Sequence, residues 1–204
     1  MNQCPKCSTP LLDFRFLIDG QVEVCEQWCP TCNCDELNRM QDMSNAAMVR
    51  LMRNLGVPHR YVPAHLTTAM YDGSSLDFSK GTIWYGESGT GKTWQMVGMM
   101  KEAILTGFKV KFFDWSEIMC KLRCKPDSYE AIIDEMKNQC GLVAIDDFYV
   151  DNNYTYDYVY NIIKVLHGAK KPLLMTASEL PAQPKIAMRL AEMTNQYEVV
   201  NEWK

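Results

Sequence analysis

A glycine-rich octapeptide near the middle of the chain carries the clearest chemical signal. It fits the spacing G-x-x-x-x-G-K-[ST] of a phosphate-binding P-loop, and its residues are Gly86, Glu87, Ser88, Gly89, Thr90, Gly91, Lys92 and Thr93. The glycines allow a tight backbone whose N–H groups converge on phosphate, and a following helix adds its positive dipole end. Lys92 would reach the β- and γ-phosphates, and the Thr93 hydroxyl would bind Mg²⁺. The octapeptide therefore predicts a site for ATP and Mg²⁺.

Two neighbouring acids form the second chemical signal. Asp146 and Asp147 follow the apolar run 142–145, which is typical of a fully buried parallel strand. Such a strand would bring the Asp146 carboxylate beside the P-loop hydroxyl, where it holds Mg²⁺. Asp147 would then orient or deprotonate the attacking water. Because the pair follows a P-loop by roughly 50 residues, it indicates a Walker B strand.

Polar residues end a later apolar run. Leu173 to Met175 reads as a further buried strand, and Thr176-Ala177-Ser178 follow it directly. A hydroxyl at this end of the strand could contact the γ-phosphate or its water. Thr176 and Ser178 are therefore both candidate catalytic residues.

Cysteines at metal-type spacing mark the N-terminus. Six of the nine cysteines lie in the first 34 residues, and two C-P-x-C turns each place two thiolates on one side. The two turns together predict a tetrahedral zinc site, whose ligands would be Cys4, Cys7, Cys29 and Cys32. Four thiolates leave no open coordination position, so the metal would be structural. Cys25 or Cys34 could instead replace a member, and a C-x-C pair of Cys32 with Cys34 is the rival arrangement.

The elements around the cysteines resemble a zinc ribbon followed by a helix. Two strands, 11–18 and 21–24, flank the hairpin signal Asp19-Gly20. Residues 35–55 read as a helix with Asp35 as its cap and Gly56 at its end. The apolar face of this helix is either ordinary core or a Met-rich surface for a partner. Residues 57–63 break regular structure twice and read as a linker.

Strands and helices alternate through the rest of the chain. The expected strands are 82–85, 109–114, 142–147, 173–175 and 197–200. The expected helices follow the P-loop and then span 115–122, 129–136, 154–166 and 185–193, while 72–80 reads as a loop. This alternation predicts an α/β fold with a parallel sheet flanked by helices. The expected domains are a zinc-ribbon segment over 1–34, a linker helix over 35–56 and a nucleotide-binding domain over 57–204.

Composition excludes several classes of function. The chain has 204 residues, 47% of them hydrophobic, with a net charge of −4 and a pI near 5.4. It therefore lacks an overall basic field, and any DNA contact must come from a local patch. The cluster Lys121, Arg123 and Lys125 is such a patch, or it is simply a solvated helix end. No apolar run approaches the roughly 20 residues of a membrane span. The N-terminus does not look like a signal peptide, so the metal-type cysteine spacing favours the cytoplasm.

The order of these motifs resembles the DnaC/IstB-type AAA+ ATPases, which include bacterial and phage helicase loaders. The resemblance covers roughly residues 57–200 and rests on the P-loop, Asp146-Asp147 and the segment Pro172 to Ser178. Val57 to Tyr61 looks like the start of the family's ATPase core, and Pro172 to Pro181 like its sensor-1 strand and turn. Lys185 to Leu190 looks like the segment that carries an arginine finger, which makes Arg189 a catalytic candidate.

The resemblance implies an ATPase that loads a replicative helicase onto single-stranded DNA and assembles with itself into a ring or spiral. A cysteine-rich N-terminal segment also occurs in some loaders and would grip the helicase. Three features depart from the family: Asp147 stands where many relatives have Glu, Thr176-Ala177-Ser178 stands where the sensor-1 strand often ends in Asn, and no helical lid with a sensor-2 arginine is visible. A transposition helper of the IstB type shares the whole core and is the alternative. A small-molecule kinase would need an arginine-rich lid, and Lys92, Thr93 and Asp146 argue against a non-catalytic adaptor.

Overall fold

The computed structural model describes residues 3–65, 78–150 and 156–200. The chain divides into two compact units: one comprises Met1–Pro63 and Ile104–Gly107, and the other comprises Ala64–Ala103 and Phe108–Lys204. Most of the loop expected over 72–80 lies outside the described residues. Among the residues that are described, no helix has both the length and the apolar character needed to cross a membrane.

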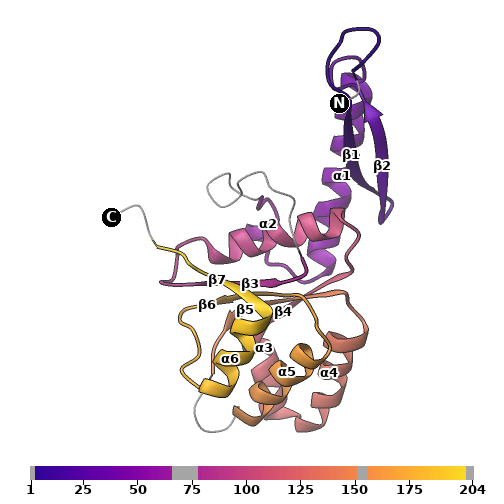
Figure 1. Ribbon diagram of the computed structural model, residues 1–204. Helices are drawn as coiled ribbons and strands as arrows, with labels where there is room; N and C mark the ends of the chain where they lie inside the picture. The colour runs from indigo at the N-terminus through magenta and orange to yellow at the C-terminus, as the bar shows by residue number, and fades with distance from the viewer. Residues whose placement is uncertain (1–2, 66–77, 151–155, 201–204) are drawn as a thin grey trace. The chain divides into compact units, whose positions relative to one another are not determined.

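The smaller unit contains an antiparallel hairpin of β1 (Leu12–Ile18) and β2 (Gln21–Trp28) (Figure 1). Asp19 and Gly20 connect the strands with φ values of 49° and 81°. Positive φ at both central residues is what a type I′ hairpin turn requires, so the predicted turn is confirmed. Strand β2 continues past the expected end at Val24, because its backbone pairs with β1 as far as Trp28.

Helix α1 (Cys34–Asn54) packs against β1. The buried residues of this helix are Leu37, Ser44, Ala47, Met48 and Met52, and Phe16 and Leu17 of β1 are buried as well. The Ser44 hydroxyl accepts a hydrogen bond of 2.8 Å from the backbone N–H of Leu17, which ties the helix to the hairpin. The prediction that Asp35 caps the helix is wrong: the N-cap is Asn33, and Asp35 lies in the first turn, where its charge still favours the helix dipole.

Glycine ends α1 as predicted. Gly56 has a φ of 82°, and its N–H donates to Arg53 O while Val57 N–H donates to Met52 O. These two bonds are the Schellman pattern that satisfies the last helical carbonyls. The expected linker that follows contains one short 3₁₀ turn, η1 (His59–Tyr61).

The larger unit is built on a five-stranded parallel sheet, confirming the predicted fold class. The order across the sheet is β4-β5-β6-β3-β7. The strands are β3 (Gly81–Tyr85), β4 (Val110–Asp114), β5 (Leu142–Phe148), β6 (Leu173–Ala177) and β7 (Thr194–Glu198). The helices are α2 (Lys92–Leu105), α3 (Trp115–Cys124), α4 (Tyr129–Asn138), α5 (Tyr156–Gly168) and α6 (Pro184–Met193), with a 3₁₀ turn η3 (Pro126–Ser128) before α4.

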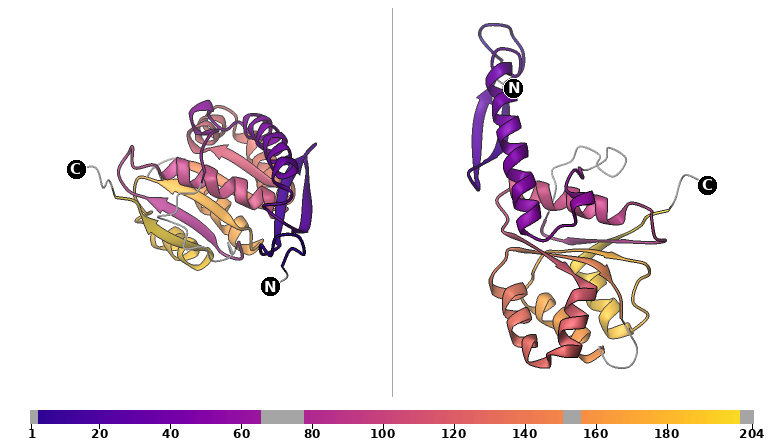
Figure 2. Two further views of the ribbon diagram at one scale, coloured as in Figure 1. Left: turned by 90° about the horizontal axis from the view of Figure 1, so that it is seen from above. Right: turned by 180° about the vertical axis from the view of Figure 1, so that it is seen from behind.

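Helices cover both faces of this sheet. Figures 1 and 2 show α2 on one face and α3, α4, α5 and α6 on the other. Because side chains alternate along a strand, Val143 and Ile145 join the core beneath α3 to α6. Asp146 follows Ile145 and so faces the side of the sheet where α2 begins. The fold thereby directs this carboxylate toward the start of the P-loop helix.

The last strand differs from its predicted position. Strand β7 spans Thr194–Glu198, whereas the apolar pattern had placed a strand over 197–200. Its residues 195–198 are exposed, and among the strands that the structure describes it lies at the edge of the sheet and pairs with β3. Backbone pairing with β3 therefore defines this strand, and hydrophobic patterning could not reveal it.

Candidate functional site

The P-loop connects the end of β3 to the start of α2, as predicted. Gly86, Gly89 and Gly91 have φ values of 134°, 83° and 89°, in the region that favours glycine. At Gly86 a side chain is also excluded by space, since an added Cβ would lie 2.5 Å from Val199 O. Helix α2 begins at Lys92, so its N-terminal backbone N–H groups lie at the end of the loop. This is the arrangement that binds phosphate groups.

The Lys92 ammonium lies over the loop. Its Nζ donates hydrogen bonds to Gly86 O at 2.7 Å and to Glu87 O at 2.6 Å. Partial burial lowers the pKa of Lys92, while the negative charges of Asp147 and Asp146 oppose that change. The lysine is therefore a half-buried cation at the loop, beside two carboxylates. Thr90 Oγ1 donates to Glu87 O at 2.9 Å and stiffens the same turn.

Three side chains from α2, β5 and β6 meet at one carboxylate oxygen. Asp146 Oδ1 accepts hydrogen bonds from Thr93 Oγ1 at 2.8 Å and from Thr176 Oγ1 at 2.6 Å. Strand β6, which carries Thr176, lies between β3, which precedes the P-loop, and β5, which carries Asp146. Burial raises the pKa of Asp146, and the bonds from Thr176 and Thr93 counteract this. A hydroxyl and a carboxylate oxygen in contact are ligands that suit Mg²⁺.

Asp147 occupies a β-bulge. Its φ is 57°, a left-handed conformation that Asp and Asn adopt more readily than other residues with side chains. The pairing of β5 with β6 shifts between Ile145 and Phe148, and the Asp147 N–H donates to Thr176 Oγ1 at 2.8 Å. The Thr176 hydroxyl thus contacts both acids at once. The Asp147 side chain is exposed at the end of the strand.

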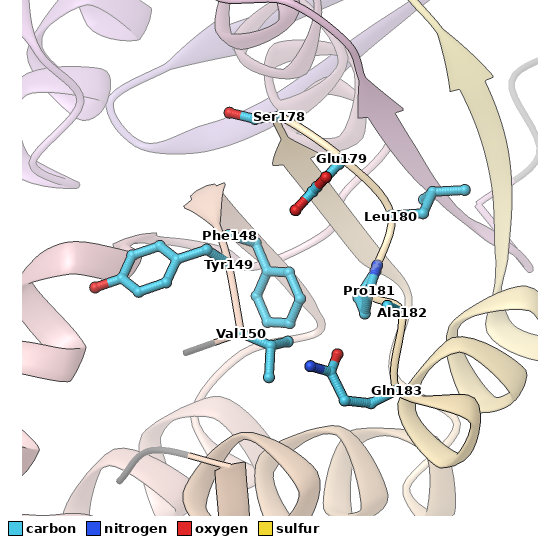
Figure 3. Close-up of a pocket in the computed structure, with 9 residues that line it drawn as sticks. All are labelled: Phe148, Tyr149, Val150, Ser178, Glu179, Leu180, Pro181, Ala182 and Gln183. Carbon is cyan, nitrogen blue, oxygen red and sulfur yellow. The ribbon is translucent and has the colours of Figure 1, made fainter. Parts of the chain in front are cut away.

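Ser178 takes a different place from Thr176. Its backbone oxygen accepts a hydrogen bond of 3.2 Å from Gly86 N–H, which links the end of β6 to the P-loop. Its exposed side chain lines a pocket of about 210 Å³. Figure 3 shows this pocket between the chain after β5 and the loop before α6, with lining residues Phe148, Tyr149, Val150, Ser178, Glu179, Leu180, Pro181, Ala182 and Gln183. Of the two predicted hydroxyls, Thr176 is the one bonded to the acids.

Arg189 lies on α6 and contacts Tyr160 of the neighbouring helix α5. Nη1 donates to Lys185 O at 2.8 Å, and Nη2 donates to the Tyr160 hydroxyl at 3.3 Å. The guanidinium also lies 4.9 Å from the centre of the Tyr160 ring, in a cation–π contact. The side chain is half-buried. Its role toward a neighbouring chain stays a prediction.

The predicted basic cluster is found at the end of α3. Lys121 and Arg123 lie in the last turn, Lys125 follows it, and all three are exposed. Cations at a helix C-terminus favour the helix dipole, so the position also suits a purely local role.

Four cysteine sulfurs converge in the smaller unit. The Sγ atoms of Cys4, Cys7, Cys29 and Cys32 all lie within 4.8 Å of one another. A tetrahedral zinc with bonds of about 2.3 Å would separate its sulfurs by about 3.8 Å, and Cys4 and Cys32 are 3.8 Å apart. The alternative residues lie elsewhere: Cys25 Sγ contacts Met40 Sδ, and Cys34 Sγ contacts Asp35. The arrangement matches the two C-P-x-C turns.

Hydrogen bonding prepares part of this cluster for the thiolate form. Contacts with Thr9 lower the pKa of Cys7 to about 6, and backbone N–H groups, Lys6 first, lower that of Cys4. The neighbouring sulfurs of Cys7 and Cys4 raise the pKa of Cys32 to about 12. Like charges at this spacing disfavour full ionisation unless a cation is bound. The donor set therefore fits a cation that binds four thiolates.

Comparison with known proteins identifies the fold. No protein-family model matches the sequence, and comparison with curated proteins finds no match. Among solved structures, DnaI is 15% identical with a TM-score of 0.56, over 71% of this chain and 92% of that one. The DnaC helicase loader is 16% identical with a TM-score of 0.55, over 70% of this chain and 100% of that one. AMPPCP-bound DnaA from Aquifex aeolicus is 17% identical with a TM-score of 0.50, over 59% of this chain and 40% of that one.

At these identities the similarity shows the fold. The chain has the AAA+ P-loop fold, which it shares with the solved DnaI and DnaC structures. This chain spans only 40% of the DnaA chain, so the activity of DnaA as a whole is not assigned to this protein.

The structure adds contacts that the sequence did not reveal. Sequence reasoning missed the bulge at Asp147, the contact between Arg189 and Tyr160, and the hydrogen bonding of Thr9 at the cysteine cluster. All three depend on tertiary placement or backbone conformation. The position of Thr9, two residues after Cys7, could have suggested its role.

Proposed function

We propose that this protein is an AAA+ ATPase that loads a replicative DNA helicase onto single-stranded DNA. The convergence of Thr93, Asp146 and Thr176 beside a P-loop is the observation that carries the ATPase assignment. The similarity of fold to DnaC and DnaI over nearly their whole length supports the loader assignment. DnaC is described as a helicase loader, and the same role is proposed for this chain.

The residues present fit ATP with Mg²⁺. Backbone N–H groups of the loop and the Lys92 ammonium would bind the phosphates, and Thr93 with Asp146 would hold the ion. Bound Mg²⁺ would neutralise charge on the phosphates during hydrolysis. Asp147 would orient the attacking water, and Thr176 would keep the two acids in place.

Arg189 would act on a neighbouring chain. A guanidinium that reaches the next chain's phosphates would stabilise charge in the transition state. In the single chain Arg189 rests on Tyr160, 4.9 Å from the ring centre. Turnover would therefore depend on self-association, in the ring or spiral that AAA+ proteins form.

The remaining predicted sites would bind zinc, the helicase and DNA. Cys4, Cys7, Cys29 and Cys32 would hold one Zn²⁺ that stabilises the N-terminal unit, and this unit would bind the helicase. Lys121, Arg123 and Lys125 would contact the phosphates of single-stranded DNA, which accounts for DNA binding by an acidic chain. The site of action would be the cytoplasm, where replication proteins meet DNA.

Two measurements on the purified protein test this proposal. Wild-type chain should hydrolyse ATP, and Lys92→Ala should abolish turnover while its circular dichroism stays unchanged. Wild-type chain should also co-purify with the replicative helicase of the organism that carries its gene. Turnover by Lys92→Ala equal to wild type would contradict the ATPase assignment. Affinity for a transposase instead of the helicase would favour the transposition helper.

A further inference from the structure

Lysines precede three strands of the parallel sheet. Lys80 directly precedes β3, Lys109 directly precedes β4, and Lys170 and Lys171 stand shortly before β6. Parallel strands begin at one edge of their sheet, and the P-loop follows the opposite end of β3. These four residues, the lysine row, therefore lie along the sheet edge opposite the proposed nucleotide site.

Contacts between neighbouring loops hold the row together. The N–H of Gly141, which precedes β5, donates a hydrogen bond of 2.7 Å to Lys109 O, and Lys171 Nζ donates to Cys140 O. Strand β6 lies between β5 and β3, so the loop with Lys171 stands between the other loops of the row. The lysines therefore form one surface of the larger unit.

Positive charge collects around Cys140 at this edge. Burial raises the pKa of the Cys140 thiol, and the positive charges of Lys171, Lys111 and Lys109 counteract this. Lys111 forms an ion pair with Glu135, and Lys171 is engaged by the Cys140 carbonyl. The cations left for a partner are those of the other lysines in the row.

Three lysines of the row are open to solvent. Lys80, Lys109 and Lys170 are exposed, and within the described residues no ion pair engages them. The chain as a whole has a net charge of −4, so the row is a local basic surface on an acidic protein. Such a surface attracts a polyanion.

The backbone of Lys170 is strained. Helix α5 ends in the same Schellman pattern as α1: Lys170 N–H donates to His167 O, and Lys171 N–H donates to Leu166 O. The left-handed residue of this pattern is Gly56 in α1, whereas in α5 it is Lys170, with a φ of 50°. Glycine adopts this conformation without strain, and a residue with a side chain does not. Lys171 already supplies a cation that favours the helix dipole. The strain at Lys170 therefore indicates a role outside the fold.

We propose that the lysine row binds the phosphate backbone of double-stranded DNA. This site adds a partner to the proposed function and does not depend on the nucleotide site. The row extends from the start of β4 to the start of β3, three strand spacings or about 14 Å. The major groove of DNA is about 12 Å wide between its two phosphate backbones. Duplex DNA also carries about one negative charge per 1.7 Å of its axis, which suits a row of point charges.

The aromatic rings beside the row favour a duplex over a single strand. Phe78 and Phe108 pack against each other with ring centroids 5.3 Å apart, and Phe78 is buried. These rings therefore serve the fold. Binding of single strands without sequence preference relies on bases that stack on open aromatic rings. Point charges alone suit the denser charge of a duplex.

Fluorescence anisotropy of labelled DNA tests the row on the full-length chain without nucleotide. The probes are a duplex of two helical turns and one of its single strands. The row variant combines Lys80→Glu, Lys109→Glu and Lys170→Glu, and it keeps Lys171 for its bond to Cys140 O. Its duplex affinity should fall at least about tenfold, and the slope of log affinity against log salt should become shallower by about 3. Single-strand affinity and ATP turnover should stay at wild-type values.

Two further variants separate the row from general charge effects and from folding. Arg39→Glu, Arg50→Glu and Lys164→Glu together change the net charge by the same amount at exposed positions elsewhere. This matched control should keep the wild-type duplex affinity. Lys170→Gly removes one cation together with the left-handed strain, so it should raise the midpoint of thermal unfolding while it weakens duplex binding.

The outcomes decide between the row and its alternatives. Selective loss of duplex binding in the row variant and in Lys170→Gly supports the proposal. Wild-type duplex affinity in either variant, an equal loss in the matched control, or no duplex binding by the wild type would overturn it. Poly-glutamate that displaces the duplex from the wild type at equal charge concentration would assign the row to an acidic protein instead. A chain that hydrolyses ATP but binds no duplex loses only the row. A chain that binds duplex through the row without hydrolysing ATP loses only the ATPase assignment.

Discussion

Removing one hydroxyl, that of Thr176, tests how the site is held together. Thr176→Val keeps a β-branched side chain of nearly the same shape in a strand position that is 2% exposed. It deletes the bond to Asp146 Oδ1 at 2.6 Å and the bond from Asp147 N–H at 2.8 Å. The substitution therefore removes polar contacts without opening a cavity.

The expected loss of stability follows from these two bonds. A hydrogen bond to an ionised group contributes about 1.5–3 kcal/mol and a neutral one about 1 kcal/mol. Asp146 keeps its bond from Thr93, and the exposed position of Asp147 allows water to replace the second contact. We therefore expect the free energy of unfolding to fall by about 2 kcal/mol, as measured by urea denaturation.

The effect on turnover should be larger than the effect on binding. The P-loop and Lys92 are untouched, so KM for ATP should stay near the wild-type value. Asp147 loses the contact that holds its left-handed backbone, and displacement of a reacting group by about 1 Å costs about 100-fold in rate. We expect kcat to fall about 10- to 100-fold in a steady-state ATPase assay. Thr176→Ser restores the hydroxyl and should recover most of the rate.

A second substitution separates the effect of the backbone conformation at Asp147 from the effect of its carboxylate. Glycine adopts a φ near 57° without strain. In Asp147→Gly the left-handed backbone conformation at this position therefore no longer depends on the hydrogen bond to Thr176. Thr176→Val should then cost less stability in the Asp147→Gly background than in the wild type, as a double-mutant cycle measures. Wild-type kcat in Thr176→Val, or additive losses in the cycle, would refute the reasoning.

The remaining predictions concern the other sites. Metal analysis should give about one zinc per chain, and Cys4→Ser should release it and unfold the N-terminal unit while sparing nucleotide binding; a metal-free, stably folded N-terminus would contradict this. Reversing the charges of Lys121, Arg123 and Lys125 should abolish single-stranded DNA binding without changing ATP affinity, and normal binding would show a merely solvated helix end. Arg189→Ala should bind ATP normally yet hydrolyse it poorly, and mixing it with Lys92→Ala should restore turnover that neither has alone. No recovery where wild-type chains assemble would exclude action in trans.

Local sequence signals predicted much of the fold. The P-loop glycines, the run before Asp146 and the turn at Asp19-Gly20 each specify a backbone conformation within a few residues. The order of these elements was enough to imply a parallel sheet. Edge strand β7 was misplaced because its exposed residues carry no hydrophobic pattern, and its backbone pairing with β3 defines it.

The residues that form the site were easier to predict than their arrangement. Sequence spacing suggested that Thr93 and Asp146 would meet, and they do, at 2.8 Å. It could not choose between Thr176 and Ser178, because that choice depends on where β6 ends: Thr176 lies within the strand, and Ser178 follows its last residue. The bulge at Asp147 depends on the register between β5 and β6, which no single segment encodes.

The central claim is that ATP use by this protein places a helicase on DNA, and a loading assay tests it most directly. The replicative helicase, circular single-stranded DNA carrying an annealed strand, and ATP are combined with this chain, and strand displacement is measured. Because a closed circle has no end for threading, displacement should require the wild-type chain and should be lost with Lys92→Ala. Equal displacement without the chain, or with Lys92→Ala in its place, would contradict the account.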